Sequence, residues 1–194
     1  MKQSGARFTI NQNNMKKNVL VFGTIAGAIV SFLMVWHMAT GIETENWDNA
    51  MLIGYASMII AFSFVFVGIK NYRDKYNGGM ITFGKAFMTG LWITLIASTM
   101  YVIVWMIYFH FFVPDFMDKY VVHMVEDAKA SGQTAAEIEK QLAEMEWYKE
   151  MYKNPLFVFF FTYLEILPVG LLITLISSFI LKRKQKNPMD VSAA

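Results

Sequence analysis

The chain has 194 residues, of which 56% are apolar and only 16% are charged, and its formal net charge is +2. Ordinary globular domains carry roughly 25% charged residues, so this composition excludes a typical soluble domain. The sequence contains no cysteine, which excludes disulfides, thiolate metal sites and cysteine nucleophiles.

Four long apolar runs occupy most of the chain, at residues 19–40, 50–69, 86–113 and 156–181. A helix needs about 20 predominantly apolar residues to cross the hydrocarbon core of a bilayer. Backbone groups in lipid must form their hydrogen bonds within their own segment, so each run is expected to be a helix. The runs contain no Lys or Arg, and their only carboxylate is Glu165. We therefore predict an all-α fold, a four-helix transmembrane bundle forming one membrane domain over residues 1–194.

The charges between the runs predict an orientation. Basic residues number four before the first run, none in 41–49, four in 70–85 and four after the last run. The long connection 114–155 has five Lys against nine acids. Because cytoplasmic loops carry the excess of Lys and Arg, both termini are expected in the cytoplasm. A cleaved signal peptide is the alternative for 19–40, but this run exceeds the roughly 7–15 apolar residues of a signal core.

The connection between the third and fourth runs predicts an extracytoplasmic helical hairpin at 115–153. A first helix over 115–130 ends at Ser131-Gly132. The spacing of Thr134 and Glu137 is typical of a capping box, in which each side chain accepts a backbone N–H of the other residue. A second helix then follows, and Asn154-Pro155 ends it. Its apolar face is expected to pack against the first helix, with a partner protein as the less favoured alternative.

Glu165 is the most informative polar residue of the runs. It lies nine residues into the fourth run, which places it near the bilayer midplane at about 1.5 Å per residue. An intramembrane acid without a cationic partner is expected to be neutral or reached by water, and it is a functional candidate by default. Pro168 cannot donate a hydrogen bond to the carbonyl of Leu164 and is expected to bend the helix beside the acid. A hydrogen bond to a neighbouring helix is the structural alternative for Glu165.

Small residues recur at a spacing of four in three runs. This spacing lets membrane helices approach closely, and intramolecular packing is the favoured interpretation, with a dimer contact through the first two glycines as the alternative. The predicted packing glycines are Gly23, Gly27, Gly90 and Gly170.

Two further groups have both a structural and a functional interpretation. The connection 70–79 mixes bases with tyrosines, which is typical of headgroup anchoring at the cytoplasmic face. The anchoring candidates are Lys70, Tyr72, Arg73 and Lys75. His37 and His110 lie near the outer ends of their runs, where interfacial hydrogen bonding is favoured over a metal pair or a proton relay with Glu165.

Two motifs carry a family resemblance that covers residues 15–186. The first is VGIKNYRD at 67–74 with Gly78, Gly79 and FGKAF at 83–87, and the second is EILPVGL at 165–171 running into ILKRK at 180–184. They resemble a bacterial membrane family named domain of unknown function 4199. The resemblance implies a four-helix inner-membrane protein with no established activity. It marks Arg73, Gly79, Glu165 and Pro168 as matching family positions without giving them a role.

No catalytic arrangement, metal motif or cofactor motif stands out in the sequence, so we expect a protein that is not an enzyme. The favoured function is an accessory, scaffold or lipid-interacting module. The alternative is a small proton-coupled transporter that uses Glu165 as its titrating group and works as a dimer. The expected partners are the lipid bilayer and either a second copy or another membrane protein, and not nucleic acid.

Overall fold

The computed structural model describes residues 2–43 and 50–183, with side chains for 13–40 and 51–183. Within these ranges it contains six α-helices and no strand longer than an isolated bridge, so the prediction of an all-α fold is confirmed. The helices are α1 (Lys2–Glu43), α2 (Ala50–Asn71), α3 (Phe83–Phe111), α4 (Phe116–Ala130), α5 (Ala135–Tyr152) and α6 (Pro155–Leu181), with a π-helical turn, η1 (Tyr72–Tyr76), directly after α2.

Four helices are long and apolar enough to cross a membrane. Their membrane-length segments are residues 13–40 of α1, 51–76 of α2 with η1, 83–111 of α3 and 155–181 of α6. These segments contain or closely match the four apolar runs of the sequence. α1 begins well before its run, in a segment that contains no proline to interrupt a helix.

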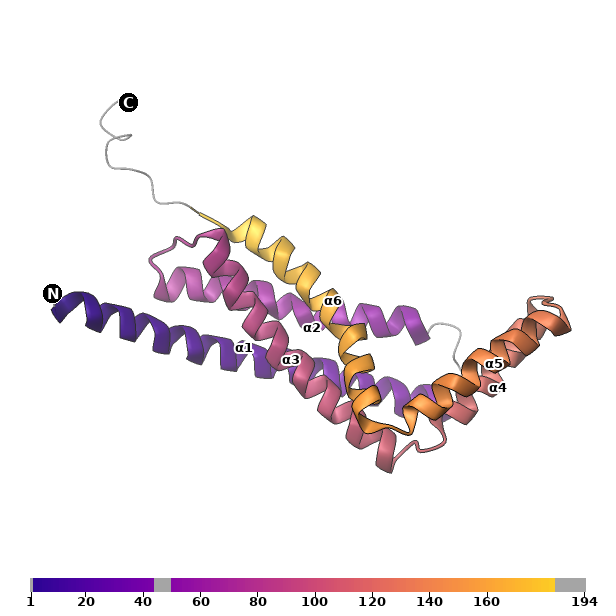
Figure 1. Cartoon of the computed structure of the whole chain (residues 1–194). Helices are drawn as coiled ribbons and strands as arrows, with labels where there is room; N and C mark the ends of the chain where they lie inside the picture. The colour runs from indigo at the N-terminus through magenta and orange to yellow at the C-terminus, as the bar shows by residue number, and fades with distance from the viewer. Residues whose placement is uncertain (1, 44–49, 184–194) are drawn as a thin grey trace.

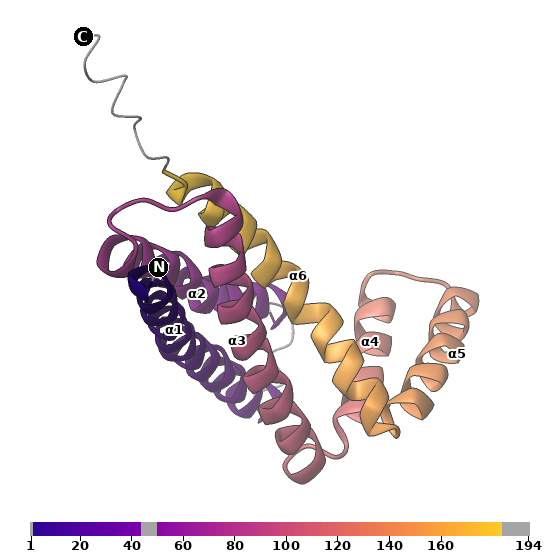
Figure 2. The same cartoon turned by 60° about the vertical axis from the view of Figure 1, so that its left-hand side comes forward.

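The four long helices form a bundle in which α1 and α6 each pack against both α2 and α3 (Figure 1). The start of α1, the connection from α2 to α3 and the end of α6 lie at the same end of this bundle. The hairpin of α4 and α5 leaves the opposite end and turns to one side of the bundle (Figures 1 and 2). We call these the basic end, after the charges described below, and the hairpin end.

The bundle interior is filled by apolar side chains from all four long helices. Phe62 and Val65 of α2, Ile93 and Val102 of α3 and Ile166 of α6 are fully buried. Apolar side chains on the outside of the same helices remain exposed, as expected where lipid is the solvent. The exposed set includes Leu20, Phe32, Ile59, Ile60, Trp92, Ile107, Leu172 and Ile180.

Local sequence explains where the helices around the hairpin begin. The Thr134–Glu137 capping box is present, with Glu137 accepting the backbone N–H of Thr134 at 2.8 Å. The Asn154 side chain accepts the Leu156 N–H at 2.9 Å, and Pro155 occupies the first turn of α6, where its missing N–H has no cost. The predicted hairpin between the third and fourth spanning helices is therefore present, with α4 beginning one residue later than predicted.

Candidate functional site

The glycines of α1 lie against α3 of the same chain. A Cβ atom added to Gly23 would lie 2.8 Å from the Cβ of Ile96, and one added to Gly27 would lie 3.2 Å from the Cα of Ala97. At these distances any larger residue would force Ile96 or the backbone of α3 to shift, which favours glycine at both positions. Because α3 already covers both positions, they leave no surface there for the alternative dimer contact.

Gly90 and Gly170 allow the close approach of α3 to α6 and α2. An added Cβ at Gly90 would lie 2.8 Å from Thr174 Cγ2, and one at Gly170 would lie 2.5 Å from Thr94 Cγ2. The resulting proximity brings the hydroxyls of Thr94 and Thr174 to 2.9 Å in a fully buried hydrogen bond. Small residues and a hydroxyl pair thus hold α3 and α6 together in the half of the bundle toward the basic end.

An asparagine on α1 joins the first two spanning helices at the basic end. Asn18 is 3% exposed, and its Nδ2 donates to the carbonyl of Gly68 at 2.9 Å. Its Oδ1 accepts from Asn71 Nδ2 at 2.6 Å. A buried amide with both sides bonded aligns α1 with α2 and satisfies a carbonyl near the end of the helix. Sequence reasoning missed Asn18, because a lone asparagine beside Lys16 and Lys17 has no distinguishing pattern.

The connection from α2 to α3 packs inward. The ring of Tyr72 is 1% exposed, and Lys85 Nζ lies 5.3 Å from its centroid. The same Nζ donates to Asn77 Oδ1 at 2.7 Å. Gly78 and Gly79 adopt φ values of 65° and 76°, which favour glycine and let the chain reverse after η1.

Arg73 joins this connection to the end of α6. Its Nε donates to Asp74 Oδ1 at 2.7 Å, and its Nη1 donates to the carbonyl of Leu181 at 3.4 Å. Arg183, two residues after Leu181, exchanges two backbone hydrogen bonds with Ile81, of 3.1 and 2.8 Å. The predicted anchoring set is therefore divided: Tyr72 and Arg73 act inside the protein because neighbouring side chains and carbonyls hold them, while Lys70 and Lys75 remain exposed.

Glu165 lies on an exposed face of α6, in a segment apolar enough to span a membrane. Its carboxylate is within electrostatic range of the hydroxyls of Tyr101 on α3 and Tyr152 on α5. Burial raises the pKa of Tyr152 to about 12, and the charge of Glu165 adds to this shift. Two phenolic side chains of the described residues thus lie within electrostatic range of the acid, and no described cation forms a salt bridge with it.

The structural alternative for Glu165 is a hydrogen bond to a hydroxyl at comparable depth on a neighbouring helix, and the candidates in the sequence are Ser31, Ser57, Ser98, Thr99 and Tyr101. Thr99 bonds Tyr163 of α6, while the hydroxyls of Ser31 and Ser98 are buried without a hydrogen-bond partner among the described residues. Tyr101 is the member of that group within electrostatic range of the acid.

Aromatic rings join the hairpin to the bundle beside Glu165. The ring of Tyr152 lies 5.7 Å from Phe109, 5.9 Å from Phe157 and 6.0 Å from Phe161, measured between centroids. The Trp105 ring meets Phe116 edge to face at 5.3 Å. Such pairs stabilise a junction beyond the apolar area they bury.

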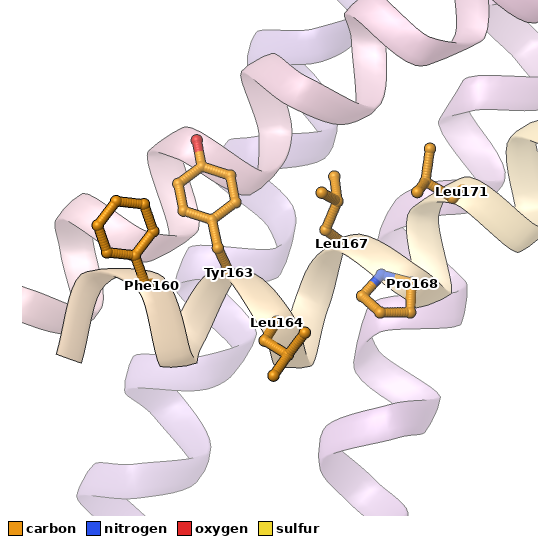
Figure 3. A pocket seen from close by; sticks show the side chains of 6 residues that line it. All are labelled: Phe160, Tyr163, Leu164, Leu167, Pro168 and Leu171. Atoms are coloured by element: carbon orange, nitrogen blue, oxygen red, sulfur yellow. The ribbon is translucent and has the colours of Figure 1, made fainter. Parts of the chain in front are cut away.

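Pro168 borders a shallow depression of about 240 Å³ on α6. Figure 3 shows its lining side chains along successive turns, with Tyr163 pointing toward α3, where its hydroxyl bonds Thr99. The walls are otherwise apolar, so the depression suits hydrocarbon rather than a polar substrate. The lining residues are Phe160, Tyr163, Leu164, Leu167, Pro168 and Leu171.

The described side chains include no group of three or more His, Asp or Glu that could hold a metal ion. His37 is half-buried and His110 is exposed beside Phe111, at 4.8 Å between ring centroids.

Four apolar helices of membrane length, packed through small residues, with cations at one end and an amphipathic hairpin at the other, define a polytopic α-helical membrane protein. A comparison with protein families matches residues 21–183, and the chain belongs to the family described as "Protein of unknown function (DUF4199)". The resemblance drawn from the two sequence motifs is confirmed. Comparisons with curated proteins and with solved structures find no match.

Proposed function

We propose that the protein is a non-enzymatic scaffold of the bacterial inner membrane that presents its hairpin to a basic surface of a partner protein. The observation that carries this proposal is the acidic surface of α4 and α5. All nine carboxylates between residues 114 and 155 are exposed. α5 has no buried residue over its 18 positions, and α4 has only Ala128.

Ion pairs within the hairpin leave much of this negative charge uncompensated. Lys119 pairs with Asp115, Lys149 with Asp118 and Lys153 with Glu150. Among the described residues, no salt bridge engages Glu126, Glu139 or Glu144. Complementary charge on a partner would speed association and select the partner.

Purification in mild detergent followed by mass spectrometry of the retained proteins tests the scaffold. We expect a stoichiometric partner that is retained by the wild-type chain and lost when Glu126, Glu139 and Glu144 are changed to Gln. The matched control changes Lys129 and Lys140 to Gln and keeps the partner. A monodisperse monomer from the wild-type chain would contradict the proposal.

The orientation with both termini in the cytoplasm is part of this proposal. Its support is the excess of cations at the basic end and of carboxylates on the hairpin. Because the chain has no cysteine, a single Cys at Gln133 can be labelled with a membrane-impermeant maleimide. We expect labelling from the extracytoplasmic side for Gln133→Cys and only after permeabilisation for Lys75→Cys. The reverse pattern would overturn the orientation.

The second candidate function is proton-coupled transport through Glu165. It is favoured by an exposed carboxylate at membrane depth with two phenolic hydroxyls in electrostatic range. This function requires pH-dependent flux in proteoliposomes that Glu165→Gln abolishes. Flux that is unchanged by the substitution, or no flux, removes this candidate.

A further inference from the structure

One carboxylate, Asp74, contacts one cation and lies within electrostatic range of two more where α2 and α6 meet at the basic end. Asp74 is bonded to Arg73 through both carboxylate oxygens, at 2.7 and 3.2 Å. The side chains of Lys70 on α2 and Arg183 after α6 are within electrostatic range of the same carboxylate. Lys182 directly precedes Arg183. We call Lys70, Arg73, Asp74, Lys182 and Arg183 the basic corner; its formal charge is +3, from four cations and one acid.

Most of the positive charge of the basic corner is not used inside the protein. Arg73 is occupied by Asp74 and by the carbonyl of Leu181. The side chains of Lys70, Lys182 and Arg183 are exposed, and none forms a salt bridge with a carboxylate of the described residues. A cluster of unpaired cations at one position raises the local concentration of anions.

Backbone and ring contacts hold this corner in place. Arg183 is tied to Ile81 through two backbone hydrogen bonds. Lys182 Nζ lies 4.9 Å from the centroid of Phe179, whose ring lies 4.7 Å from that of Phe83 on α3. An anion would therefore bind to cations whose backbone is already ordered, which reduces the entropy lost on binding.

The surface next to the corner is apolar. Ile176, Phe179 and Ile180 lie within the last turns of α6 and expose 49%, 52% and 65% of their surface. These residues belong to a membrane-length segment, so hydrocarbon chains are their natural contact. The occupant that fits both features carries an anionic head and an apolar body.

We propose that the basic corner binds one anionic phospholipid, with its phosphate at Lys70, Lys182 and Arg183 and an acyl chain along Ile176, Phe179 and Ile180. A zwitterionic headgroup binds less tightly because Lys70, Lys182 and Arg183 repel its ammonium group. Asp74 lowers the affinity by partly neutralising the corner. The inference rests on the proposed function in one respect: the proposed orientation places the bound lipid in the cytoplasmic leaflet.

Lipid titration of the purified full chain in nonionic detergent tests the site, with bound lipids counted by native mass spectrometry. The probes are phosphatidylglycerol, phosphatidylcholine with the same acyl chains, and inorganic phosphate. We expect one phosphatidylglycerol to bind at least tenfold tighter than phosphatidylcholine. Each surface cation changes affinity for an anionic lipid by about fivefold, so Lys182→Gln with Arg183→Gln should weaken binding about 25-fold.

Three matched variants distinguish this site from general electrostatics. Lys129→Gln with Lys140→Gln, on the hairpin, removes the same charge and should leave binding unchanged. Asp74→Asn should strengthen binding about fivefold, and Lys70→Gln, on another helix, should weaken it about fivefold.

Several outcomes would overturn the site. These are equal binding of the two lipids, equal loss in the hairpin control, weaker binding after Asp74→Asn, or displacement of the lipid by inorganic phosphate at equal concentration. The last outcome would instead identify a site for a soluble anion. Because the assay uses detergent and no partner, it can fail while the hairpin scaffold stands, and the reverse also holds.

Discussion

The two ends of the bundle differ in what holds them together. Toward the basic end, glycines bring backbones close, Thr94 bonds Thr174, and the amide of Asn18 connects two helices, all in buried surroundings. At the hairpin end, bulky rings form the junction, and α5 has no buried residue. Local opening requires more free energy where buried contacts are denser. We therefore expect a rigid half that positions the chain in the membrane and a looser half that is free to engage a partner.

The largest predicted effect breaks the rigid half at its closest helix contact. Gly170→Ala would place a Cβ 2.5 Å from Thr94 Cγ2 and 2.8 Å from Phe62 Cζ. Overpacking of this kind should lower the free energy of unfolding by about 3 kcal/mol. The measurement is SDS titration in mixed micelles followed by tryptophan fluorescence. Gly54→Ala is the control, because an added Cβ there meets nothing within 4 Å. An equal loss of unfolding free energy in the two variants would show that the close contact at Gly170 does not stabilise the bundle.

Removing the buried amide at the basic end should have the next largest effect. Asn18→Ala leaves the carbonyl of Gly68 and the amide of Asn71 without their partner. A buried polar group left unsatisfied costs about 2 kcal/mol. The same SDS titration measures this loss. Asn13→Ala, at an exposed position of α1, should be neutral, and an equal loss there would show that Asn18 has no special role.

At the hairpin end, Tyr152→Leu should loosen the junction while leaving the bundle intact. The substitution keeps apolar volume but removes ring contacts to Phe109, Phe157 and Phe161. We expect a local loss of about 1.5 kcal/mol, detected as faster hydrogen exchange in the last turns of α5. Unchanged exchange in α5, or equally faster exchange in α3 around Gly90, would argue against a separable junction.

The smallest predicted effect concerns the start of α5. Thr134→Ala removes the cap and should cost about 1 kcal/mol of local helix stability. The Thr134 backbone and hydroxyl hold the pKa of Glu137 below its ordinary value of 4.5. This contribution is therefore complete above that value and is lost as the pH falls through the lower pKa of the folded hairpin. The protection factors of the α5 amides, which correct for the intrinsic pH dependence of exchange, should fall in acid for the wild-type chain and change less for Thr134→Ala.

Much of the fold follows from the sequence because lipid imposes strong constraints. Length and apolarity alone predict the four spanning helices, and residues as local as Thr134 and Asn154-Pro155 predict the helix starts around the hairpin. The π-helical turn after α2 was not predicted, since no periodicity in 72–76 distinguishes it from a loop.

The candidate sites are less predictable because they depend on which helices become neighbours. Sequence reasoning identified Glu165 and the cations of 70–75, but it did not indicate that Tyr72 turns inward or that Arg183 comes within electrostatic range of Asp74. Long-range pairs such as Asn18 with Gly68, or Ile81 with Arg183, leave no local pattern. The tertiary arrangement of the helices creates them.

The backbone pairing of Ile81 with Arg183 has a consequence for biogenesis. Until α6 leaves the ribosome and enters the membrane, the amide and carbonyl of Ile81 and the Nη1 of Arg73 lack their final partners. In a nascent chain with three inserted helices these groups bond water at the membrane surface, and they exchange it for protein partners only when the end of α6 arrives. A chain truncated before Arg183 lacks the backbone partner of Ile81, so its connection between α2 and α3 stays open until the last residues of the bundle have been synthesised.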